Sequence, residues 1–108
     1  MPTSAQLILC NCPSRECAEI IATTLLEKRL AACITISTPV TSFYMWQGAL
    51  QKEDEVVLMI KSTQHAYSAL ETCLKSAHPY ELPEIIAVSV EDGLPAYLNW
   101  LTECTKKS

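Results

Sequence analysis

The sequence is poor in basic residues and in glycine. Its eight lysines and arginines, against twelve aspartates and glutamates, are scattered along the chain. A surface that follows a phosphate backbone needs basic residues gathered on one face, so nucleic acid is disfavoured as a partner. With two glycines and no repeat, the composition is not that of a disordered tail or a flexible linker. We expect one globular domain over residues 1–108.

Long hydrophobic runs are also absent. No stretch approaches the roughly 18 apolar residues that span a bilayer, and residues 1–6 lack a basic region followed by an apolar core. We therefore expect a cytoplasmic protein with no membrane partner. The six cysteines are then free thiols rather than disulfides. Four of them stand among apolar residues, where a thiol packs as a small hydrophobic group: Cys17, Cys33, Cys73 and Cys104.

The order of apolar runs and turn residues predicts four strands and three helices. Ser14 is suited to cap the first helix, and Ser62 or Thr63 the second. Pro95 at a first helical position opens the third helix. The strands are expected at residues 7–10, at 32–46 with a bend near Pro39, at 55–61 and at 85–90. Residues 47–48 and 51–54 are expected to form the turn of a long hairpin.

This order predicts an α+β fold, a ferredoxin-like βαββαβ sandwich with an extra C-terminal helix. Its spatial strand order is 4-1-3-2 in sequence numbering. Residues 35–46 span roughly 40 Å when extended, whereas a domain of this length has a diameter of only about 34 Å. The hairpin must therefore protrude. Because it carries Phe43, Tyr44 and Met45, we expect neighbouring copies to cover it in a closed oligomer.

The most informative stretch is residues 77–84, where the second helix gives way to the last strand. Pro79 biases His78 away from helical dihedrals and ends the helix. In the predicted topology the first strand ends at this corner, so Cys10 and Cys12 converge on His78. Thiols and an imidazole are ligands for copper or zinc. The pattern lacks a Cys-x-x-Cys motif, so structural thiols beside a loop histidine are the alternative interpretation.

The predicted metal ligands at this corner are Cys10, His78 and Glu84. Cys12 shares a strand face with Cys10, but Pro13 follows it at the strand exit, and we expect it to turn away. One thiolate, one imidazole and water would form a weak, exchangeable copper site, with other divalent cations as alternative occupants.

A second hypothesis is a cleft between subunits that binds a small anionic ligand, with the protein acting as a sensor or scaffold. Its walls would be Tyr44, Trp46, Lys61, Tyr80 and Glu84. An enzymatic role for Cys12 as a thiolate near a helix start ranks last, because no base is identified for it. We therefore expect no enzyme. An RNA-binding module is disfavoured because residues 55–61 carry no aromatic side chain on which a base could stack.

Four blocks, in order, resemble the CutA divalent-cation tolerance family: residues 27–33, 41–48, 57–61 and 78–84. The resemblance extends from about Leu7 to about Trp100. It implies a homotrimer with a ferredoxin-like fold, similar in shape to PII-type signalling proteins, involved in tolerance of copper and other divalent cations, with no established reaction. The copper ligands proposed for a bacterial member, one cysteine and two adjacent histidines, correspond here to Cys10, Ala77 and His78, so the first histidine is replaced by alanine.

Overall fold

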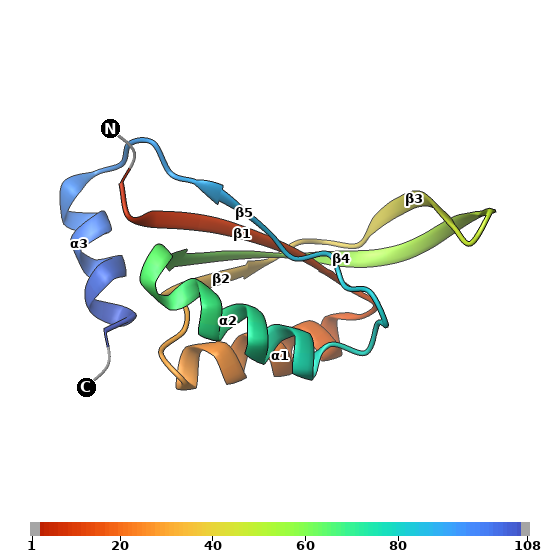
Figure 1. Ribbon diagram of the computed structural model, residues 1–108, viewed down its shortest axis with the longest axis horizontal. Helices are drawn as coiled ribbons and strands as arrows, with labels where there is room; N and C mark the ends of the chain where they lie inside the picture. Colours follow the sequence, from red (N-terminus) through yellow and green to blue (C-terminus); the bar gives the residue numbers. More distant parts are fainter. Residues whose placement is uncertain (1–2, 107–108) are drawn as a thin grey trace.

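The computed structural model describes residues 3–106, which form five strands and three helices (Figure 1). In chain order they are β1 (Ala5–Cys12), α1 (Arg15–Glu27), β2 (Cys33–Ile36), β3 (Val40–Trp46), β4 (Ala49–Thr63), α2 (Gln64–Ala77), β5 (Ile86–Ser89) and α3 (Pro95–Cys104). The bend predicted at Pro39 separates β2 from β3, because a proline cannot donate to a ladder of backbone hydrogen bonds.

The main sheet has the order β2-β4-β1-β5, and each neighbouring pair is antiparallel. This is the predicted ferredoxin-like order, which is confirmed. Helices α1 and α2 cover one face of the sheet, and α3 lies at the end away from the hairpin (Figure 1). Among residues 3–106, no helix combines the length and the apolar character that crossing a membrane requires.

The core lies between the sheet and the two covering helices. Alternate residues of β1 and β4 point into it, as the two-residue period of a strand requires. Ser14 caps α1 as predicted, since its Oγ accepts a hydrogen bond from the Cys17 backbone N–H at 3.1 Å. The core residues that are fully or almost fully buried include Ile8, Cys10, Cys12, Ile21, Leu25, Leu58, Ile60, Leu70 and Leu74.

On the opposite face of the sheet, α3 reaches only the end, where the Thr105 hydroxyl that follows it lies 3.0 Å from that of Thr63, and no other helix of residues 3–106 lies over this face (Figure 1). The strand register places Leu9 between Met59 of β4 and Ile86 of β5 on this open face. Ile86 and Val88 are about half exposed. A single chain therefore leaves apolar sheet surface in contact with water.

The hairpin of β3 and β4 extends beyond the helices and contributes to a longest dimension of 45 Å (Figure 1). Its turn consists of Gln47 and Gly48, with φ of 51° and 80°. Residues 51–54, expected in the turn, instead belong to β4. That expectation is wrong because two residues with positive φ close a tight hairpin, so β4 begins directly at Ala49.

Candidate metal centre

Two thiols lie beneath the helices at the end of β1. Cys10 and Cys12 are two residues apart on a strand, so both side chains point to the covered face of the sheet. Both are fully buried, and neither forms a disulfide. The prediction that Cys12 turns away is wrong, because β1 keeps its pairing with β4 as far as Cys12 opposite Val56.

His78 ends α2 and lies against the end of β1. Its backbone is extended (φ −82°, ψ 137°), as expected for a residue that precedes proline. The side chain is buried. Nδ1 accepts a hydrogen bond from the Tyr80 backbone N–H at 3.1 Å, which assigns the ring proton to Nε2. Nε2–H donates to the Asn11 carbonyl oxygen at 2.7 Å.

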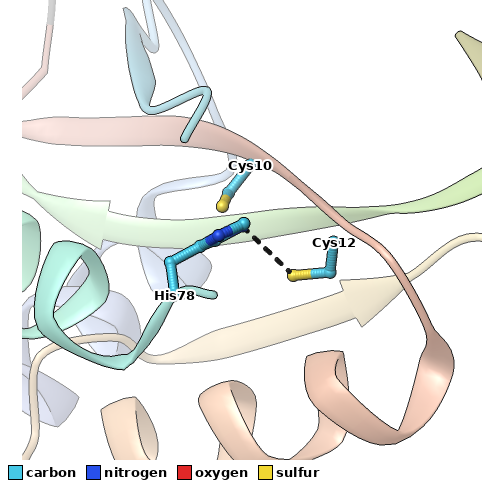
Figure 2. Close-up of side chains that lie close together, drawn as sticks. All are labelled: Cys10, Cys12 and His78. Carbon is cyan, nitrogen blue, oxygen red and sulfur yellow. Dashed lines mark hydrogen bonds between the residues drawn. The ribbon is translucent and has the colours of Figure 1, made fainter. Parts of the chain in front are cut away.

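These three side chains form one group (Figure 2). Cys12 Sγ lies 3.9 Å from His78 Nε2, and the ligand atoms of Cys10, Cys12 and His78 are all within 4.8 Å of one another. The structure thus brings Cys10 to His78 as the topology predicts, and it adds Cys12. The group offers two soft sulfur donors and one nitrogen donor, which suits copper or zinc.

The two thiols of β1 interact with each other. The neighbouring Cys12 sulfur raises the pKa of Cys10, and burial raises it further. The neighbouring Cys10 sulfur lowers the pKa of Cys12. Cys12 is therefore the sulfur of this pair that ionises first, while Cys10 keeps its proton, and its Sγ lies 3.8 Å from the Asn11 carbonyl oxygen. A metal ion that displaced the proton of Cys10 would meet two sulfurs on the same strand face.

Glu84, the third predicted ligand, lies outside this group. It is exposed, in the loop that leads to β5, and it lines a separate cavity of about 630 Å³ between that loop and the hairpin. Tyr44, Trp46 and Tyr80 line the same cavity, so the structure brings four of the five proposed cleft residues together. Lys61 is not among them. Its Nζ donates to Thr35 Oγ1 at 3.2 Å, on the open face of the sheet.

Carboxylates dominate the charge of this cavity. Glu53, Glu55, Glu81 and Glu84 line it, and none of the described residues that line it is basic. A small anion would need positive charge that the described residues do not place there. The cavity therefore favours a cationic occupant over the anionic ligand expected to bind Lys61.

Glu55, at the base of the hairpin, connects this cavity to the group of Cys10, Cys12 and His78. It is only 5% exposed and accepts hydrogen bonds from Tyr80 Oη at 2.7 Å and from Asn11 Nδ2 at 3.1 Å. Burial acts to raise its pKa, but the nearby Ser42 hydroxyl, the hydrogen bonds from Tyr80 and Asn11, and nearby His78 hold the pKa below its ordinary value. Asn11 thus joins Glu55 through its side chain and His78 through its carbonyl oxygen.

Comparison with known proteins identifies the family. The profile of the family described as "CutA1 divalent ion tolerance protein" matches residues 6–104, which is most of the chain. The chain belongs to the CutA1 family. The resemblance predicted from the four sequence blocks is confirmed.

Curated CutA relatives cover the chain almost completely. "Divalent-cation tolerance protein CutA" of Thermus thermophilus is 43% identical over 93% of this chain and 97% of its own length. "Protein CutA" of Mus musculus is 40% identical over 98% of this chain, which spans only 60% of the mouse protein. The crystal structure of CutA from Xylella fastidiosa superposes with a TM-score of 0.94 at 41% identity, covering 96% of this chain and all of that one.

Two residues of this candidate site, Asn11 and Glu55, escaped prediction from the sequence. Asn11 stands between the two cysteines, where an amide interrupting an apolar run was a signal for a buried hydrogen bond. Glu55 was placed at the start of a strand, with no sign that Tyr80 would reach it. Cys12 is a candidate metal ligand in the sequence, but its side chain does not turn away from Cys10 as expected.

Proposed function

We propose that this divalent-cation tolerance protein binds copper at the corner formed by Cys10, Cys12 and His78. The observation that carries the proposal is that two buried thiols and an imidazole lie within 4.8 Å of one another. Soft thiolates favour copper over the hard cations that prefer oxygen ligands. Because Cys12 joins Cys10, the site has two sulfur donors and is stronger than the one-thiolate site expected from the sequence.

His78 is not free to act as a ligand in this arrangement. Nε2 carries the proton that Asn11 accepts, and moving this proton to Nδ1 would place it against the Tyr80 N–H. Coordination through Nε2 would therefore break at least one of these hydrogen bonds, at about 1–3 kcal/mol for a buried group left without a partner. The thiols provide most of the binding energy, and His78 positions the end of β1 beside them.

The test is an anaerobic titration of Cu(I) against a competing chelator. We expect Cys10→Ser and Cys12→Ser each to weaken Cu(I) binding at least about tenfold, and His78→Ala to weaken it less, because a hard hydroxyl replaces a soft ligand only in the first two. Cys104→Ser, in α3 at the far end of the sheet, is the matched control and should leave the affinity unchanged. Equal affinities in all five proteins would show that this corner is structural.

We infer that the protein is a homotrimer, as the resemblance to the family implies. Supporting this are the open apolar face of the sheet and the protruding hairpin, on which Phe43, Met45 and Leu50 are each more than 60% exposed. A closed ring of copies would cover these surfaces and pair the exposed strand edges.

An alternative function is that of a PII-like sensor or scaffold, supported by the 630 Å³ cavity walled by Tyr44, Trp46 and Tyr80. The acidic lining would then select a small cation. We propose no enzymatic activity: Cys12 and His78 resemble a nucleophile and its base, but both are buried, and Nε2 is a donor rather than an acceptor.

We place this function in the cytoplasm, where the six cysteines remain reduced. The names of relatives do not all indicate the cytoplasm. One CutA of known structure, from Archaeoglobus fulgidus, is called a periplasmic divalent cation tolerance protein.

A further inference from the structure

The protruding hairpin has two faces, and the cavity of about 630 Å³ lies on one of them. Because side chains alternate along paired strands, Tyr44 and Trp46 of β3 share a face, and the register places Glu53 of β4 on the same face. The exposed pair Met45 and Leu50 lies on the other face. The cavity is therefore separate from the apolar pair that a neighbouring copy would cover in the proposed trimer.

Aromatic side chains form much of the cavity on both of its sides. Tyr44 and Trp46 come from the hairpin, and Tyr80 comes from the loop that leads to β5. Tyr80 is held in place, because its hydroxyl donates to Glu55 at 2.7 Å and its ring packs against that of His78, with centroids 4.7 Å apart. The faces of such rings attract cations and also pack against methylene groups.

Carboxylates also stand on both sides. Glu53 is exposed on the hairpin, and Glu81 and Glu84 are exposed on the loop. The ion pairs found among residues 3–106 involve none of these three. Within the described residues that line the cavity there is no lysine or arginine to neutralise them. A ligand that crosses from the hairpin to the loop would therefore meet negative charge on each side.

The arrangement of these carboxylates does not suit a metal ion. Among residues 3–106, three or more thiol, imidazole or carboxylate groups come close enough to share an ion at Cys10, Cys12 and His78 and nowhere else. A hard cation such as Mg²⁺ or Ca²⁺ needs several oxygens around one point. Charges on two sides of an aromatic cavity instead match an organic cation whose positive groups are separated by an apolar chain.

We propose that this cavity binds a linear aliphatic polyamine. Its ammonium groups lie at the carboxylates of the hairpin and of the loop, and its methylene groups lie against Tyr44, Trp46 and Tyr80. Charge complementarity and the aromatic lining carry the inference. It rests on the alternative function, a sensor with a cation-selecting cavity, and names the class of ligand for that site. It does not depend on copper binding.

The experiment titrates the full-length protein with spermidine at low ionic strength and follows tryptophan fluorescence, because salt screens exposed charges. The chain has two tryptophans, and Trp100 lies in α3 at the end away from the hairpin (Figure 1). Trp100→Phe therefore leaves Trp46 as the sole reporter. In this background we expect a saturable change in emission with spermidine. Butylamine, which carries one charge, should bind at least about tenfold more weakly.

Charge variants in the same background test the two sides of the cavity. Glu53→Gln and Glu84→Gln should each weaken spermidine binding about threefold, and the double variant about tenfold, as expected for separate exposed ion pairs. Glu27→Gln is the matched control. It removes the same charge from the exposed end of α1, beside Arg29, which reaches the Lys106 carbonyl oxygen, and it should leave the affinity unchanged. Thermal unfolding at the temperature of the parent protein verifies that each variant is folded.

The contrary outcomes are distinct. Affinity unchanged in the Glu53→Gln/Glu84→Gln variant would overturn the inference, and so would equal affinity for Mg²⁺ and spermidine, which would leave a cation-selecting cavity in place. Binding seen only in a monomeric Phe43→Glu/Met45→Glu protein would overturn it by showing that a neighbouring copy fills the cavity. If neither cation binds in any form, the alternative function fails as well, while the Cu(I) titration decides the copper proposal separately.

Discussion

Replacing both Phe43 and Met45 by glutamate is expected to convert a trimer of about 36 kDa, three times the chain mass of 12.0 kDa, into a folded monomer. Both side chains are 64% exposed in the single chain, so the two substitutions should change the stability of the monomer little. In a trimer that covers the hairpin, the same carboxylates would be buried without partners, and an unpaired buried charge is strongly destabilising.

Light scattering at micromolar concentration measures the mass, and far-UV circular dichroism tests whether the fold persists. The matched control is Ile20→Glu on the outer face of α1, where the replaced side chain is 61% exposed and lies on the helical layer instead of the hairpin. The control should remain trimeric. A wild-type mass of 12.0 kDa, or a double variant that stays trimeric, would contradict the proposed role of the hairpin.

The second large effect is expected at Glu55. Glu55→Gln should destabilise the protein by about 2 kcal/mol at neutral pH, because hydrogen bonds to a buried charged group are stronger than those to a neutral one. The glutamine amide also presents a donor toward either Tyr80 or Asn11, each of which donates to the carboxylate. Urea unfolding at one fixed protein concentration measures the difference, since the stability of an oligomer depends on concentration.

This difference should depend on pH in a defined direction. Folding lowers the pKa of Glu55, so its stabilising effect is complete above the ordinary value of 4.5 and is lost as the pH falls through the lower folded pKa. The gap between wild type and Glu55→Gln should therefore be constant near neutrality and shrink in acid. Glu53→Gln, an exposed neighbour on the same strand, is the control and should change stability little. A gap that widens in acid would contradict the assignment of Glu55 as a buried carboxylate.

The fold followed from local signals that the structure bears out. The order of the elements could be predicted from Ser14 before a helical pattern, from Pro79 after one, and from alternating apolar residues in the strands. This order, with right-handed crossovers, predicted the ferredoxin-like strand arrangement that the structure has. Boundaries were less accurate. β4 extends over residues 51–54 because the preceding turn needs only Gln47 and Gly48, and the polar side chains of the strand gave no sign of pairing.

The candidate metal site was predictable only in part. Topology brings Cys10 to His78, since both lie where β1 and α2 end. The direction of Cys12 depended on whether strand pairing survives to the residue before Pro13, which the sequence does not reveal. The tautomer of His78 depends on the carbonyl of Asn11 and the N–H of Tyr80. The sequence does not show which backbone groups will become hydrogen-bond partners of a side chain.

The most direct test of copper binding at this corner is a crystal soaked anaerobically with Cu(I) and measured at the copper absorption edge. We predict one anomalous peak per chain, within bonding distance of Cys10 Sγ and Cys12 Sγ at the junction of β1 and α1. A peak among the carboxylates of the cavity beside Tyr44, with none at the sulfurs, would contradict the proposal, as would a soaked crystal with no copper in either place.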